Sequence, residues 1–163
     1  MSNLETTTLS GGCFWGMQEI IRSLPGVMST VVGYMGGHTV DPTYEQVKQG
    51  ITGHAESVQV VFDSEKITYY ELLDYFFRMH DPTTLHRQGD DIGHQYRSVI
   101  FYHTEDQRQV AEEVKRRVEV SGKWPAPLTT EIVPASTFYK AEDYHQDYLK
   151  RHPNGYNCHW LRK

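Results

Sequence analysis

The chain contains 163 residues, with 16 Lys and Arg against 21 Asp and Glu, and its formal net charge at pH 7 is −5. No basic cluster stands out, so nucleic acid and anionic membranes are poor candidates as partners. The length suits a single domain over residues 1–163 with its own hydrophobic core. Because no leader, long apolar run or cysteine-rich framework occurs, we expect neither secretion nor a membrane span, and we expect a cytoplasmic location.

The first predicted elements are a strand and a helix joined by a glycine turn. Residues 5–9 are polar and rich in Thr, and Gly11-Gly12-Cys13 follows. Apolar residues then recur at three- and four-residue steps from Phe14 to Leu24, until Pro25-Gly26 stops the pattern. We therefore expect a helix whose first turn carries Cys13.

The remaining elements alternate between strands, loops and helices. In chain order we predict a strand over 27–34, a loop over 36–46, a strand over 54–62, a helix over 69–80, a loop over 87–96, a strand over 98–102, a helix after Thr104, a strand over 129–133 and a short helix over 141–151. The first six regular elements follow the order of the split β-α-β pattern. We therefore predict an α+β fold, with a ferredoxin-like split β-α-β core in which helices pack on a mixed or antiparallel sheet. Residues 134–163 form an irregular C-terminal extension.

Cys13 is the candidate nucleophile. A thiol at a helix start meets unpaired N–H groups and a favourable dipole, which can lower its pKa from about 8.5. The alternative is a small buried core residue, which is the usual role of an intracellular cysteine. Trp15 lies off the apolar stripe of the helix, beside the sulfur, and indicates a small apolar binding surface. Phe14 begins that stripe and serves either as core or as a pocket wall.

Glu56 is the candidate proton donor. It shares one face of its strand with Val58, Val60 and Phe62. Burial of a carboxyl raises its pKa, so Glu56 can stay protonated near neutral pH and donate a proton. The alternative places Glu56 at a frayed strand end, where it reaches solvent or pairs with a basic residue.

Tyr44 and Tyr96 lie in polar, loop-like segments, where a phenol can donate a hydrogen bond to a developing oxyanion. The alternative is a half-buried tyrosine that packs on a loop. The histidines show no metal-ligand spacing, so we expect neither a metal nor a cofactor.

Cys158, in the tail, has two interpretations. It can form a structural disulfide with Cys13, worth roughly 5 kcal/mol in the chain-entropy model, although a cytoplasmic setting disfavours such a bond. It can instead be a mobile thiol that resolves an oxidised Cys13. The residues alone leave open three other functional classes for this protein: a thiol peroxidase or general disulfide oxidoreductase, a non-catalytic redox-responsive binding module, and a cysteine acyl transferase.

Several ordered motifs resemble one known family over nearly the whole chain. The motifs are Gly12-Cys13-Phe14-Trp15-Gly16, Thr43-Tyr44-Glu45-Gln46-Val47, Gly53-His54-Ala55-Glu56, Asp91-Ile92-Gly93-His94-Gln95-Tyr96-Arg97-Ser98 and Asn154-Gly155-Tyr156-Asn157-Cys158. Together they resemble the A-class peptide methionine sulfoxide reductases, and the last motif resembles members with a C-terminal recycling cysteine.

The resemblance implies a reaction and a role for each residue. Cys13 attacks the sulfoxide sulfur of an S-epimer methionine sulfoxide, in a protein, a peptide or the free amino acid, and Glu56 protonates the leaving oxygen. The other residues implied are Tyr44 and Tyr96 as ligands of that oxygen, Phe14 and Trp15 as the cup for the S-methyl group, and Asp91 as a substrate-pocket residue.

The resemblance also implies how the enzyme is recycled. Cys13 becomes a sulfenic acid, Cys158 resolves it as a disulfide, and thioredoxin reduces that bond. Two features depart from the family pattern. His94 occupies a position where a smaller polar residue is expected, and the chain lacks the third cysteine of some relatives. We therefore expect thioredoxin to attack the Cys13–Cys158 bond directly.

Overall fold

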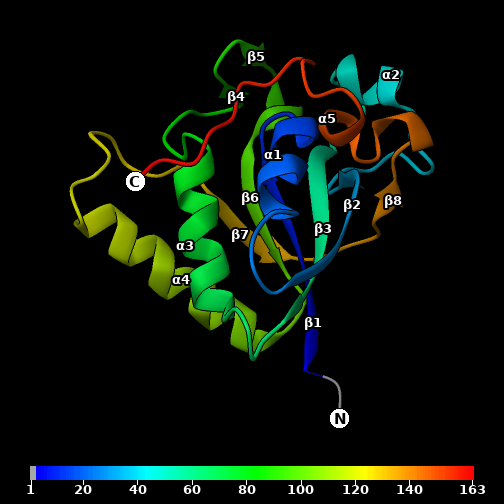
Figure 1. Cartoon of the computed structure of the whole chain (residues 1–163). Coiled ribbons are helices and arrows are strands. Elements are labelled where there is room, and N and C mark those ends of the chain that lie inside the picture. The colour runs from blue at the N-terminus through cyan, green and yellow to red at the C-terminus, as the bar shows by residue number, and fades with distance from the viewer. Residues whose placement is uncertain (1–2) are drawn as a thin grey trace.

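A six-stranded sheet forms the centre of the molecule, whose computed structural model describes residues 3–163 (Figure 1). Its strands are β1 (Leu4–Gly11), β2 (Val27–Met35), β3 (Ala55–Asp63), β6 (Ser98–Tyr102), β7 (Glu131–Pro134) and β8 (Tyr139–Lys140). They lie in the order β7-β6-β1-β3-β2-β8. Neighbouring strands are antiparallel except β6 and β7, which are parallel. The predicted combination of helices with a mixed sheet is confirmed.

The main core lies between the sheet and three helices, α1 (Phe14–Ile21), α3 (Tyr69–Met79) and α4 (Glu105–Val120). Val58, Val60 and Phe62 project from β3 into this core. The residue between the first two, Gln59, is only half-buried, as the alternation of a strand requires. A smaller apolar cluster, which includes Ala55, has the opposite parity along β3 and packs on the other face of the sheet. Glu56 shares the parity of the main core and therefore points toward the helices.

The structure adds short elements to two segments predicted as loops. Within 36–46 begins α2 (Tyr44–Lys48), where the Thr43 hydroxyl accepts from Gln46 N–H and the Gln46 side chain accepts from Thr43 N–H. This reciprocal capping box lets a very short helix form. Within 87–96 lie β4 (Arg87–Gln88), β5 (Asp91–Ile92) and the 3-10 helix η1 (His94–Tyr96), and β4 and β5 pair as a hairpin.

The predicted helix over 141–151 is broken into two short pieces, η2 (Asp143–His145) and α5 (Tyr148–Arg151). Between them Asp147 adopts a left-handed conformation with φ 53°. Its N–H donates to the Gln18 side chain on α1, while Gln146 bonds the backbone of Val32 on β2. These tertiary bonds outweigh helix propensity, which is only a weak preference.

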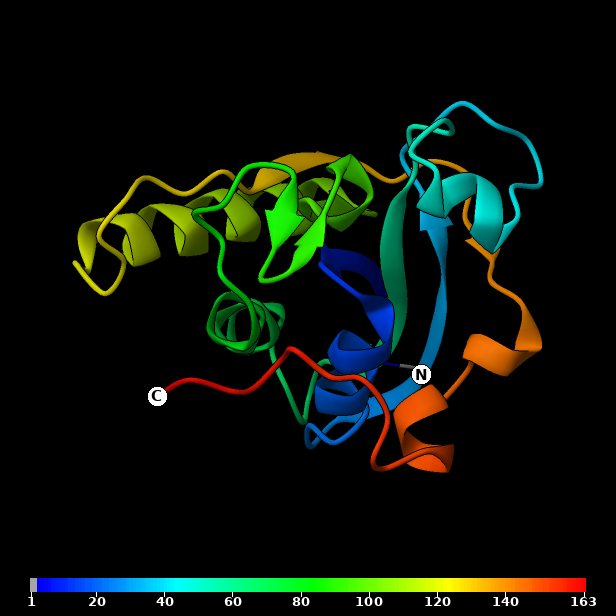
Figure 2. The same cartoon turned by 90° about the horizontal axis from the view of Figure 1, so that it is seen from above.

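The C-terminal extension wraps around the end of the sheet that carries Cys13. β8 pairs with β2, and α5 packs on α1. Figure 2 shows the last residues crossing α1 and ending near α3. Within the described part of the chain, every helix is too short or too polar to cross a membrane.

Helix α3, which carries much of the core, depends on a capping box at its start. Thr68 accepts from Glu71 N–H at 3.0 Å, and Glu71 accepts from Thr68 N–H at 3.1 Å. Replacing Thr68 by Ala should lower the free energy of unfolding by about 1 kcal/mol, because the cap on an orphan N–H is lost. Urea denaturation measures this change. Thr68→Ser keeps the hydroxyl and should remain close to wild type; equal losses in both variants would contradict the capping explanation.

Candidate active site

Cys13 lies at the junction between β1 and α1. Gly12 has φ +103°, and a Cβ there would lie 2.7 Å from Cγ of Gln88, so only glycine suits this turn. Cys13 is the N-cap of α1, one residue before the first helical position, and its side chain is half-buried. The predicted strand, glycine turn and helix are confirmed, with the cysteine directly at the helix entrance.

The Cys13 thiol is harder to ionise than its place at a helix start suggested. Burial raises its pKa well above the ordinary value, and negative charge on Glu56 raises it further. A hydrogen bond from the Trp15 N–H lowers the pKa, as expected near a helix N-terminus, but does not outweigh burial. The prediction of a lowered thiol pKa is therefore wrong for this state of the protein.

Glu56 is a buried carboxyl directly beside the nucleophile. Its side chain is 2 % exposed, and its Oε1 accepts a hydrogen bond from the Phe14 N–H at 3.1 Å. Burial raises its pKa to about 8, against the opposing effect of the Phe14 bond, and the charge of Asp91 adds to the increase. None of the ion pairs in the described residues involves Glu56. The exposed and ion-paired alternatives are therefore excluded, and the carboxyl is mainly protonated at pH 7.

Tyr44 and Tyr96 approach the same centre from two different elements. Tyr44 begins α2, and its N–H donates to Glu142 Oε2 at 2.9 Å, while Tyr96 ends η1. Burial raises the pKa of both phenols, and charge on Glu56 is the next cause for each. Both hydroxyl groups therefore keep their protons and can act as hydrogen-bond donors.

Phe14 and Trp15 contribute an aromatic surface at the helix start. Phe14 is 1 % exposed and lies 6.4 Å from the Tyr44 ring in a stacked arrangement. Trp15 is half-buried and stacks on Tyr148 at 3.9 Å. Phe14 thus belongs to the core as well as to the neighbourhood of Cys13, whereas the half-buried Trp15 packs against the edge of the core.

Two residues of the extension, His145 and Glu142, escaped the sequence analysis. His145 accepts a hydrogen bond from Trp15 Nε1 through its Nδ1 at 2.9 Å. Glu142 accepts one from the Tyr34 hydroxyl at 2.8 Å. His145 therefore orients the indole, and Glu142 joins α2 to β2. The only signal was local, a run of polar residues in the extension, and it did not reveal these distant partners.

Cys158 lies on the same side of the molecule as Cys13. Both cysteines are free thiols, and charge on Cys158 is among the causes that raise the pKa of Cys13. The Cys158 sulfur is 3.6 Å from Asp91 Oδ2 and accepts a hydrogen bond from the Tyr156 phenol. The structure therefore groups Cys158 and Asp91 with the other predicted residues and contains no structural disulfide between the two cysteines.

His94 begins η1 and is half-buried. Its ring meets His86 edge-on at 6.4 Å, and its carbonyl accepts from Arg97 Nη1 at 2.8 Å. Burial lowers its pKa, as do the neighbouring Arg97 and His86. Its Nε2 is buried without a hydrogen-bond partner among the described residues, and Tyr96 lies two residues further on.

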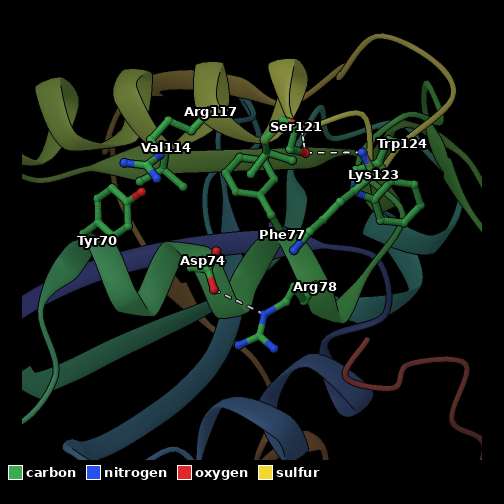
Figure 3. A pocket seen from close by; sticks show the side chains of 10 residues that line it. Tyr70, Asp74, Phe77, Arg78, Val114, Arg117, Ser121, Lys123 and Trp124 are labelled. Carbon is green, nitrogen blue, oxygen red and sulfur yellow. Dashed lines mark hydrogen bonds and ion pairs between the residues drawn. The ribbon is translucent and has the colours of Figure 1, made fainter. Parts of the chain in front are cut away.

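A separate hollow lies between α3 and α4 (Figure 3). Aromatic and apolar side chains line it together with polar and charged ones, among them Arg117 over the Tyr70 ring and an Arg78–Asp74 ion pair of 3.3 Å. None of the predicted site residues lines this hollow. The described residues also contain no cluster of three or more side chains suited to hold a metal ion.

Comparisons with known proteins agree on one family. The family model for peptide methionine sulfoxide reductase matches residues 5–163. The peptide methionine sulfoxide reductase MsrA of Methanothermobacter thermautotrophicus is 53% identical over 162 residues, which cover 99% of this chain and 95% of that protein. The reduced form of Mxr1 from Saccharomyces cerevisiae superposes with a TM-score of 0.93 at 38% identity, covering 99% of this chain and 93% of that one. Mxr1 in complex with Trx2 gives a TM-score of 0.68 at 29% identity, covering 99% and 91%.

The raised pKa of Glu56 predicts how stability depends on pH. The unfolded chain loses this proton near its ordinary pKa of about 4.3, whereas the folded protein keeps it up to a pKa of about 8. Glu56 therefore destabilises the fold increasingly as pH rises from the lower to the higher value. Replacing Glu56 by Gln, whose oxygen can still accept from Phe14 N–H, should stabilise the protein by on the order of 3 kcal/mol at pH 7.

Chemical denaturation of wild type and Glu56→Gln at a series of pH values measures this difference. The gain should shrink toward zero below about pH 4, where the carboxyl is protonated in both states. A gain of equal size at acidic and neutral pH would show that burial of the charge is not its cause.

Proposed function

The chain belongs to the peptide methionine sulfoxide reductase family and is an enzyme of that class, and we propose that it reduces the S epimer of methionine sulfoxide with Cys13 and Glu56. Substrates are the oxidised residue in proteins and peptides, and the free amino acid. Residues 1–163 act as one catalytic domain, in which 134–163 form the extension that carries the second cysteine. The observation that carries this proposal is the protonated, buried carboxyl of Glu56 next to the thiol-bearing residue.

The first step joins a nucleophile to a proton donor. The Cys13 sulfur attacks the sulfoxide sulfur and an S–S bond forms, while Glu56 protonates the oxygen, which is a poor leaving group without that proton. The S–O bond breaks, the released hydroxide attacks the Cys13 sulfur, and the S–S bond breaks as methionine leaves. The Cys13 thiol supplies the proton that restores Glu56, so no net proton is consumed. The products are methionine and a sulfenic acid on Cys13. Burial raises the pKa of both groups, so both favour their protonated forms before substrate binds.

The aromatic and phenolic side chains fit the remaining parts of the substrate. Tyr44 and Tyr96 donate hydrogen bonds to the sulfoxide oxygen while charge develops on it, because their raised pKa values keep them protonated. Phe14 and Trp15 contact the S-methyl group, and Asp91 helps to form the substrate pocket.

Cys158 regenerates the enzyme. Its thiol attacks the sulfenic sulfur of Cys13, an S–S bond forms, the S–O bond breaks, and water leaves. Thioredoxin then reduces the disulfide directly. Support comes from Mxr1, the relative seen with Trx2, and from the absence of any third cysteine in the chain.

We also infer that the four central strands form a ferredoxin-like split β-α-β core. They lie in the order β6-β1-β3-β2, neighbours are antiparallel, and α1 and α3 are the crossover helices. This arrangement brings the start of α1 over β3, and thereby Cys13 to Glu56.

Glu56→Gln tests the proton donor. The amide keeps the shape and can accept the same hydrogen bond, but it has no proton to give. We expect the rate constant for methionine release in a single turnover to fall about 10²- to 10⁴-fold, which is the usual size of general acid catalysis. Rapid chemical quench with an S-epimer sulfoxide measures it. Glu45→Gln, which changes an exposed glutamate on α2, is the matched control; a Glu56→Gln rate equal to that of the control would refute the assignment.

Cys158→Ser separates the first step from recycling. The variant should release one methionine per chain and lose one thiol, whereas wild type should lose two thiols per methionine, as a thiol titration can count. Multiple turnover with thioredoxin as sole reductant should stop, because no disulfide can form. Full steady-state activity under those conditions would overturn the role of Cys158.

A further inference from the structure

His159, the residue that follows Cys158, is buried beside the turn that leads to Cys13. His159 is only 6 % exposed, although it lies four residues from the end of the chain. Its Nε2 lies 2.8 Å from the carbonyl oxygen of Gly11, in the turn that leads to Cys13. A carbonyl only accepts hydrogen bonds, so Nε2 carries the proton and donates. Burial lowers the pKa of His159, which agrees with a neutral ring.

From this contact we infer that His159 is a positioning residue for disulfide formation: it seats the tail on the turn of Cys13 and thereby sets the rate at which Cys158 attacks the sulfenic acid. The inference rests on the proposed resolving role of Cys158. It concerns the second chemical step alone, because the hydrogen-bond partners of the His159 ring are the Gly11 carbonyl and, at Nδ1 and 3.6 Å, the Cys158 sulfur.

Gly16 provides the space for this ring. A Cβ at Gly16 would lie 2.4 Å from His159 Nδ1 and 2.6 Å from Asn157 Oδ1. Gly16 is inside α1, where glycine is less favourable than alanine. The position of the tail explains why glycine nevertheless occupies position 16, because any larger residue there would displace both His159 and Asn157.

The seat of His159 also determines where Cys158 lies. The N–H of His159 donates to Asn157 Oδ1 at 2.9 Å, so the residues on either side of Cys158 are held in one turn. Further along, the N–H of Arg162 donates to the carbonyl of Arg78 at 2.8 Å, at the end of α3. The thiol is thus presented from a turn whose C-terminal side is bonded to the body of the protein. Holding two reacting groups together in this way raises their effective concentration and the rate of their reaction.

The step that His159 controls needs no further reactant. The thiol of Cys158 and the sulfenic acid of Cys13 become a disulfide and water: the S–S bond forms, the S–O bond breaks, and the thiol proton leaves with the hydroxyl group. The His159 ring stays neutral throughout. Its removal should therefore slow this step and leave the preceding release of methionine unchanged.

Two independent substitutions disturb the seat from opposite sides. His159→Leu removes the hydrogen bond to Gly11 and keeps a side chain of similar size. Gly16→Ala fills the space of the His159 ring and at the same time favours the helix, so it leaves the fold of α1 intact. His159→Gln restores a donor at the position of Nε2 and should recover most of the rate. His152→Leu changes an exposed histidine of the same extension and is the matched control.

A rapid-quench experiment with an S-epimer sulfoxide follows methionine release and disulfide formation separately. His159→Leu and Gly16→Ala should slow disulfide formation by about tenfold or more and leave first-turnover methionine release within about twofold of wild type, since only the proximity of the thiols has changed. His159→Gln and His152→Leu should resemble wild type.

Other outcomes overturn the inference in recognisable ways. Disulfide formation at the wild-type rate in both His159→Leu and Gly16→Ala would show that the seat does not control the step. Equal slowing of both steps, or His159→Gln as slow as His159→Leu, would show that the ring merely supports the fold. Should wild type itself form no Cys13–Cys158 disulfide, the resolving role fails first, and the test of His159 is negative with it. If His159→Leu does not fold, Gly16→Ala and His159→Gln still decide the question.

Discussion

The arrangement of the site depends on one hydrogen bond, from the N–H of Phe14 to the buried carboxyl of Glu56. An N–H in the first turn of a helix has no partner within that helix and must find one elsewhere. Here the partner comes from β3, so the bond joins the start of α1 to the centre of the sheet. The same bond places the carboxyl next to Cys13. Burial on this side of β3 keeps the carboxyl protonated, because an ionised group there would have neither water nor a cation as a partner.

The Cys13 thiol and the Glu56 carboxyl at this junction each become harder to ionise when the other is charged. A charged Glu56 raises the pKa of Cys13, so the thiolate is easiest to form while the carboxyl is neutral. This is the pairing that the proposed first step needs, since the thiolate attacks and the neutral acid supplies a proton. Burial suppresses the thiolate in the resting protein as well. A low population of reactive thiolate before substrate binds limits wasteful reaction with other electrophiles, because the thiolate is the reactive form of cysteine.

Local patterns predicted the elements that bury one regular face. The alternation in β3 placed Glu56 on the core side, and the step from Gly11-Gly12 into a helical pattern placed Cys13 at a helix entrance. The pKa of Cys13 was predicted in the wrong direction, because the helix N-terminus is visible in sequence whereas the depth of burial is a property of the assembled fold. The capping box of Thr43 and Gln46 was present in the sequence, yet its helix was missed because the element is so short. The predicted helix over 141–151 is wrong for a different reason. Its local pattern suits a helix, but Gln146 and Asp147 bond to residues far away in the sequence, and these bonds interrupt it.

Two glycines near Cys13, Gly12 and Gly16, are required because a side chain at either position would collide with its surroundings. Gly12 is required by its own backbone angle and by the closeness of Gln88, but Gly16 lies in a helix, where its conformation suits any residue. Its requirement comes from the far end of the chain, where His159 and Asn157 occupy the volume of a Cβ. A motif that is local in sequence therefore encodes a contact across more than a hundred residues. The space that a side chain at position 16 would need is therefore filled by the protein's own tail.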